Sequence, residues 1–166
     1  SFVMDLSFLP ASFPDTAKVW IYQASRALTP DENQVLSAKA KAFASGWTAH
    51  KMALQADAAV VNNLLLLLIV DENQASVSGC SIDSSVHFVK EIGVELGVDF
   101  FNRLNVAYLL NEQVHVVHFQ TLIEQIKSGA INATEIRIFN NLVGNVAELK
   151  SKWLVPVGES WIARSI

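Results

Sequence analysis

An unbroken apolar run at residues 64–70 limits the possible folds more than any other part of the sequence. It consists only of Leu, Ile and Val, and Asn62, Asn63 and Asp71 stand at its borders. The run is far shorter than the roughly 20 residues that a membrane-spanning helix needs. A short apolar run between turn residues is typical of a strand that is covered on both faces. We therefore expect a buried central strand and no membrane association.

Two amphipathic helices are predicted around this run. Thr29 and Glu32 form a T-x-x-E capping box with Pro30 in the first turn, which marks the start of the first helix. The second helix is expected to use Ser81 or Asp83 as its N-cap, and a glycine within its apolar stripe would let its backbone approach the sheet closely. The stripes are formed by Leu36, Ala40, Phe43 and Trp47 in the first helix and by Ile82, Val86, Val89, Gly93 and Leu96 in the second.

The remaining strand patterns define the expected fold. Asn62 and Asn63 favour a hairpin between the apolar run and the segment before it, with a single long strand as the alternative. The order of elements, strand–helix–strand–strand–helix–strand, is that of a ferredoxin-like βαββαβ sheet with both helices on one face. The strand patterns other than the run itself lie at 18–24, 58–61, 106–110 and 114–119, and the last two flank a polar turn that predicts a hairpin.

The length of 166 residues predicts one α+β domain, 1–166. We expect an extended arm at 1–17, the βαββαβ core at 18–119 and a C-terminal α/β extension at 120–166 packed on that core. Within the extension we expect a helix at 120–127, a strand formed by Ile136, Ile138 and Leu142, and a last helix that starts at an N-x-x-E box of Asn145 and Glu148. The pattern leaves open whether the extension covers the chain's own sheet or that of a neighbour.

Composition excludes several classes of partner. The net charge is −4, and Lys and Arg are scattered singly, so we expect no binding to nucleic acid. Cys80 is the sole cysteine, which excludes an internal disulfide and fits a reducing compartment. The first residues lack a basic start followed by an apolar stretch, the pattern of a signal peptide. A cytoplasmic location is therefore predicted, and no motif calls for a cofactor.

A known sequence pattern is matched by residues 19–24, 47–50, 78–83 and 139–143, together with Trp153, Pro156, Ser160 and Trp161. These stretches resemble a family of small uncharacterised bacterial proteins that often carry the label "ABC transporter ATPase". The resemblance spans nearly the whole chain but implies no catalytic residues. Lys51 stands where the family pattern has a glycine, which puts a tight turn at that point in doubt.

The label that comes with this family fails a chemical test. A nucleotide-hydrolysing domain of that class needs a G-x-x-x-x-G-K-[ST] loop, whose amides and lysine hold the phosphates. No glycine in this sequence is followed by lysine. We conclude from the sequence that the protein is not an ATPase.

Cys80 is the best candidate for catalytic chemistry. A thiol at a helix start meets the positive end of the helix dipole, which favours the thiolate. Asp83 and His87 lie four residues apart on the same helix, and His50 follows the first helix, so an acid–base–nucleophile set is conceivable. The alternative is that Cys80 is a small buried apolar residue, and Asp83 beside it would oppose thiolate formation.

Histidines and carboxylates do not form a recognised metal motif. His50, Asp71, Asp83 and His87 lack the spacing of motifs such as H-E-x-x-H. His115 and His118 would point to opposite faces of a strand. The sequence therefore predicts no metal site.

Aromatic and amide side chains supply the candidate binding surface. Alternation along the first strand puts Trp20 and Tyr22 on one face, which we expect to be the face away from the helices. That face must be covered by the C-terminal segment, a second subunit or a ligand. Asn140, Asn141 and Trp161 are further ligand or interface candidates, although two asparagines in succession are also typical of a turn. The function predicted is a non-catalytic binding or interaction module that self-associates, and the alternative is a small cysteine-dependent enzyme centred on Cys80.

Overall fold

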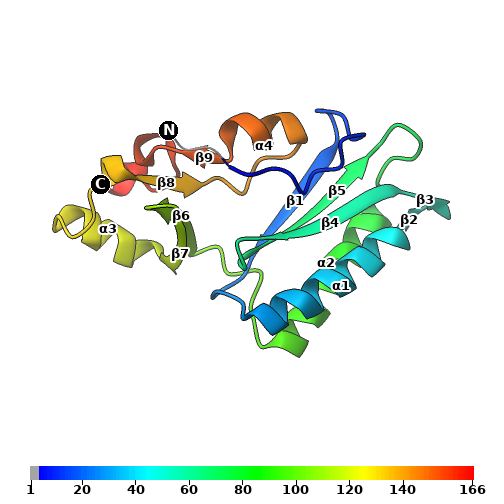
Figure 1. The fold of residues 1–166 in the computed structure, drawn as a ribbon, viewed down its shortest axis with the longest axis horizontal. Coiled ribbons are helices and arrows are strands. Elements are labelled where there is room, and N and C mark those ends of the chain that lie inside the picture. Colours follow the sequence, from blue (N-terminus) through cyan, green and yellow to red (C-terminus); the bar gives the residue numbers. More distant parts are fainter. Residues whose placement is uncertain (1–3) are drawn as a thin grey trace.

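The computed structural model describes residues 4–166, so residues 1–3 of the expected arm lie outside the described residues. It confirms a mixed α+β fold with antiparallel sheets. Among residues 4–166, no helix combines the length and the apolarity needed to cross a bilayer. The elements in chain order (Figure 1) are β1 (Lys18–Gln23), α1 (Pro30–Ser45), β2 (Thr48–Ala49), β3 (Met52–Ala53), β4 (Gln55–Val61), β5 (Leu65–Asp71), α2 (Gly79–Leu96), β6 (Asn105–Leu110), β7 (Gln113–His118), α3 (Phe119–Lys127), β8 (Ile136–Phe139), α4 (Val146–Lys152) and β9 (Leu154–Val155).

The first sheet is built around the apolar run, as predicted. Its order is β1-β5-β4, with both pairings antiparallel. The turn between β4 and β5 contains Asn62 and Asn63, each at φ 54°, a left-handed conformation that asparagine tolerates. Every residue of β5 is buried, because α1 and α2 cover one face of this sheet and the N-terminal arm with the C-terminal segment lies over the other (Figure 1).

The ferredoxin-like strand order is not confirmed. That order would place β6 beside β1, but β6 pairs with β7 and β8 in a second sheet of order β7-β6-β8-β9. The outer edge of β1 is already occupied: the Val19 amide donates to the Gly144 carbonyl at 3.0 Å, and Lys18 forms a bridge with Asn145. A strand edge has one set of outward amides and carbonyls, so the edge used by residues 144–145 is closed to β6.

The C-terminal segment covers the sheet of its own chain. The Val146 amide donates to the Ala17 carbonyl and the Ala147 amide to the Asp15 carbonyl, each at 3.0 Å. The buried side chains of α4, together with Trp153, belong to the same apolar core as β1 and β5. A second core lies between the second sheet and α3 with the last turns of the chain. It consists of Val106, Tyr108, Leu122, Ile123, Ile136, Ile138, Val157 and Ile162.

Helix starts follow their local capping chemistry, with one correction. The predicted Thr29 box is present: Thr29 Oγ1 accepts the Glu32 amide at 3.2 Å and Glu32 Oε1 accepts the Thr29 amide at 2.9 Å. The cap of α2 is Ser78 rather than Ser81 or Asp83, because Ser81 is the third residue of the helix and its Oγ accepts the Ser78 amide at 2.6 Å. Ser78 and Ser81 thus form a reciprocal box in which a serine replaces the usual glutamate.

Two further expectations need correction. Gly93 approaches the chain that follows α2 instead of the sheet: a Cβ at this position would lie 2.7 Å from the Val98 carbonyl oxygen. The strand in the C-terminal segment ends at Phe139, and Leu142 is left 87% exposed in the loop before α4. The last helix does begin where Asn145 caps it, since Asn145 Oδ1 accepts the Glu148 amide at 2.8 Å.

The ion pair at the start of α1 predicts an acid-sensitive contribution to stability. Arg26 donates two hydrogen bonds of 2.8 Å to the Glu32 carboxylate, and these, with the Thr29 amide, lower the pKa of Glu32 from 4.5 to about 2. A carboxylate whose pKa is lowered by folding stabilises the fold above its unfolded pKa and loses that effect as pH falls through the folded value. We therefore expect the urea midpoint of the wild type to fall more steeply between pH 4.5 and pH 2 than that of Glu32→Gln. Glu124→Gln, at an exposed site, serves as the control and keeps the steeper decline; equal slopes for all three proteins would contradict the prediction.

Candidate functional site

The residues proposed for cysteine chemistry are not assembled by the fold. Cys80 is exposed in the first turn of α2, so the alternative that it is a buried apolar residue is wrong. Within residues 4–166 no hydrogen bond or ion pair joins it to His50, Asp83 or His87. His87 Nε2 instead lies 3.0 Å from Glu91 Oε1 on the outer face of α2, and His50 sits in the turn between β2 and β3 at φ 51°.

The other histidines have structural partners that sequence reasoning missed. His115 stacks on Tyr108 of the neighbouring strand with ring centroids 5.1 Å apart. His118 caps α3, because its Nδ1 accepts the Gln120 amide at 3.2 Å. Histidine is not among the preferred N-cap residues, so no signal in the sequence indicated this cap.

Trp20 and Tyr22 face the helices, which corrects their predicted placement. Trp20 meets Trp47 edge-on at 5.9 Å, and the Trp47 indole donates to the Ser81 carbonyl of α2 at 2.8 Å. Tyr22 hydrogen-bonds to Ser85 of the same helix, and burial raises the pKa of the Tyr22 hydroxyl. Strand alternation pairs side chains on a face but does not say which face a helix covers. The aromatic platform that motivated an interface at these residues is therefore absorbed into the core.

The asparagines after β8 hold the two sheets together. Asn141 Nδ2 donates to Gln23 Oε1 at 2.9 Å and Asn141 Oδ1 accepts the Trp153 indole at 3.0 Å. Gln23 Nε2 in turn donates to the Asn105 carbonyl of β6 at 3.1 Å. Asn140 shapes the turn, because its Oδ1 accepts the Leu142 amide at 3.2 Å. Asn141 therefore links the end of β8 to β1, whereas the side chain of Asn140 bonds within its own turn.

Trp161 remains accessible. Its side chain is 52% exposed and leans on Phe119 at the start of α3, with ring centroids 5.5 Å apart. A shallow depression of about 470 Å³ lies nearby in the C-terminal segment, lined by Ala133, Thr134, Arg137, Pro156, Val157, Gly158, Ala163 and Ile166.

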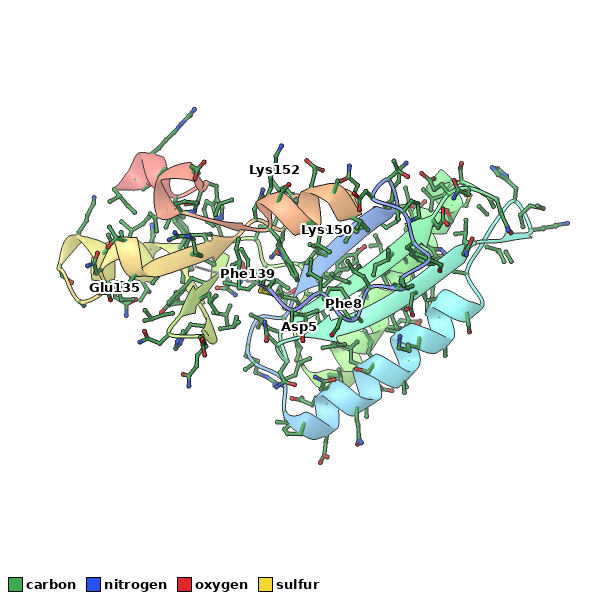
Figure 2. All side chains as sticks on the ribbon, turned by 45° about the horizontal axis from the view of Figure 1, so that its top comes forward. Asp5, Phe8, Glu135, Phe139, Lys150 and Lys152 are labelled. Carbon is green, nitrogen blue, oxygen red and sulfur yellow. The ribbon has the colours of Figure 1, made fainter. Side chains whose placement is uncertain are left out.

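A larger groove of about 780 Å³ lies where the N-terminal arm passes between the two sheets. The turn after β4 and the turn after β6 form its walls. Glu135 lies beside the β6–β7 turn because Leu110 pairs with Ile136. Figure 2 shows Asp5 and Phe8 on the arm and Glu135 at the far end of the second sheet. The groove is lined by Met4, Asp5, Ser7, Phe8, Val60, Val61, Asn62, Leu109, Asn111, Glu112 and Glu135.

The groove combines an apolar floor with acidic ends. No Lys, Arg or His is among its lining residues, and within the described chain none of Asp5, Glu112 and Glu135 forms an ion pair. The Ser7 amide donates to Asp5 Oδ1 at 2.9 Å, and this hydrogen bond lowers the pKa of Asp5 and favours its ionised form. Four separate segments of the chain meet here, so the sequence held no single motif that would have revealed the site.

Comparison with known proteins adds no further constraint. No protein-family model, no characterised relative and no solved structure matches the chain. The resemblance to the bacterial family with the ATPase label therefore stays a prediction, and the functional argument rests on the geometry of the site.

Proposed function

We propose that this protein is a non-catalytic binding module that takes its ligand in the groove between the N-terminal arm and the two sheets. The observation that carries the proposal is the pairing of an apolar floor with three carboxylates that have no cationic partner in the described chain. Ligand sites are usually concave, mainly apolar and supplied with a few polar groups that fix orientation. This groove is concave, and its lining combines five apolar residues with six polar or acidic ones.

The lining defines the class of ligand. Val60, Val61 and Leu109 offer apolar surface, whereas Glu112 and Glu135 put negative charge at one end. A ligand that matches both has an apolar body and a positively charged group, as in a short peptide that contains leucine and arginine. The charged contacts are open to solvent, so each contributes about 1 kcal/mol or less and weakens with added salt.

A titration followed by backbone NMR tests the proposal. The probe is the peptide acetyl-Leu-Arg-Leu-Arg-amide at low salt, and the control is its counterpart with glutamate in place of arginine. We expect shifts at Asp5, Asn62, Asn111 and Glu112 with the first peptide and no shifts with the second. Shifts that are absent, or that spread over the surface without a maximum at the groove, would overturn the proposed function.

Substitution of the groove carboxylates tests the charge contribution separately. We expect Glu112→Gln combined with Glu135→Gln to weaken probe binding about tenfold, because two solvent-exposed charge contacts of up to about 1 kcal/mol each are removed. Glu124→Gln, on the exposed side of α3, is the matched control and should leave affinity unchanged. An equal effect of the control and the double variant would show that net charge, rather than the groove, sets the affinity.

The alternative proposal, cysteine-dependent catalysis at Cys80, can be separated from the binding module by the reactivity of the thiol. If the protein is a binding module, His50→Ala and His87→Ala leave the rate at which Cys80 reacts with a disulfide reagent unchanged from pH 6 to pH 9, because neither histidine contacts the thiol. The measurement is the absorbance of the released thiolate under native conditions. A slower reaction, or a displaced pH midpoint, in either variant would favour the enzyme over the binding module.

A further inference from the structure

The outer edge of β7 carries unpaired backbone groups. β7 hydrogen-bonds to β6 alone. A two-residue turn, Asn111–Glu112 with φ of 50° and 63°, joins them, and Leu110 therefore forms a hydrogen-bonded pair with Gln113. Because such pairs alternate along an antiparallel ladder, the amides and carbonyls of Val114 and Val116 point away from β6. No residue among 4–166 hydrogen-bonds to them from the outer side.

The other long edges of the two sheets are covered in part. On β4, Lys41 Nζ donates to the Ala58 carbonyl at 2.9 Å, and Asp57 Oδ1 accepts the Ala58 amide at 2.8 Å. On β1, residues 144–145 occupy the edge at Lys18 and Val19. Charged side chains at an edge are a common protection against pairing with another chain. β7 lacks this protection, since its sequence QVHVVH contains no Asp, Glu, Lys, Arg or Pro.

We propose that β7 is a strand-pairing surface and that its occupant is β7 of a second copy of this chain, antiparallel across a two-fold axis. With the axis at Val116, the two Val116 residues lie opposite each other and Val114 lies opposite His118. In this register the outward groups of each copy meet complementary groups of the other. No Asp, Glu, Lys or Arg side chains oppose each other, and β-branched residues are favourable cross-strand neighbours. A two-fold interface is the commonest way in which identical chains associate.

The arrangement joins the second sheets of two copies into one continuous sheet. Each copy contributes a single strand, so the contact is smaller than a standard interface, and we expect a weak dimer with a dissociation constant on the order of 100 µM. The inference is independent of the groove, whose lining includes no residue of β7.

Two measurements on the full chain test the inference. In sedimentation equilibrium between 10 and 500 µM, the average mass of the wild type should rise toward that of a dimer. Val116→Pro removes an outward amide, which an edge strand tolerates, and should stay monomeric over the same range with an unchanged circular dichroism spectrum.

NMR spectra of the wild type as a function of concentration locate the contact without any substitution. We expect concentration-dependent shifts at residues 113–118, with Ala58 on the protected edge of β4 unchanged. If Val116→Pro fails to fold, the concentration-dependent shifts of the wild type test the β7 contact without it. A wild type that is monomeric at 500 µM, or shifts that lie away from β7, would overturn the inference.

Discussion

Replacing Trp153 with alanine is expected to lower the free energy of unfolding by about 3–5 kcal/mol, the usual range for removing a buried aromatic side chain. Trp153 is 1% exposed and meets Phe139 edge-on, with ring centroids 5.4 Å apart. Its indole also donates to Asn141 Oδ1 at 3.0 Å. The substitution thus opens a cavity in the main core and leaves the amide that bridges the two sheets without one of its partners. Urea unfolding followed by circular dichroism gives the value.

Two further variants separate the contributions at this site. Trp153→Phe keeps most of the apolar volume but removes the indole donor, and should cost about 1–3 kcal/mol through the unsatisfied Asn141 oxygen. Trp161→Ala is the matched control at an exposed tryptophan, where we expect a loss below about 1 kcal/mol. Equal losses for Trp153→Ala and Trp161→Ala would show that the packing of the C-terminal segment has been assigned incorrectly.

Gly93→Ala is expected to destabilise the protein by about 2 kcal/mol, although alanine is the better helix former by about 1 kcal/mol. The added Cβ would lie 2.7 Å from the Val98 carbonyl oxygen and 3.4 Å from the Phe100 ring. The carbonyl belongs to the backbone, and the Val98 amide is already bonded to the Gly93 carbonyl at 2.9 Å, so the chain cannot move away without breaking that bond.

Gly79→Ala provides the control for Gly93→Ala within the same helix. A Cβ at Gly79 would meet no atom within 4 Å, so this substitution should leave stability unchanged or raise it by up to about 1 kcal/mol. Thermal and urea unfolding of the two variants test the contrast. A gain in stability for Gly93→Ala would contradict the close approach described above.

Features that depend on local chemistry could be predicted from the sequence. The Thr29–Glu32 box, the Asn145 cap and the Asn62–Asn63 turn each involve residues within a few positions of one another. The burial of β5 was also predictable, because a run without polar residues has no face suited to solvent. These predictions need no knowledge of the rest of the fold.

Features that depend on distant parts of the chain could not be predicted. The strand order depends on residues 144–145, which pair with β1 at the edge where β6 would lie in a ferredoxin-like fold. Trp20 and Tyr22 contact the helices because α1 and α2 cover their face of the sheet. Strand alternation shows that the two residues share a face but not which face the helices cover. The groove likewise exists only because the arm, the β4–β5 turn and the β6–β7 turn meet in space.

The closure of β1 by residues 144–145 has a consequence for synthesis on the ribosome. The chain emerges from its N-terminus, so β1, β5 and β4 are available to pair well before the segment that closes the β1 edge has left the exit tunnel. During that interval a nascent chain presents an unprotected strand edge and an apolar sheet face that lacks α4 and Trp153. Emergence of residues 144–153, rather than formation of the first sheet, is thus the step that covers this edge and this face.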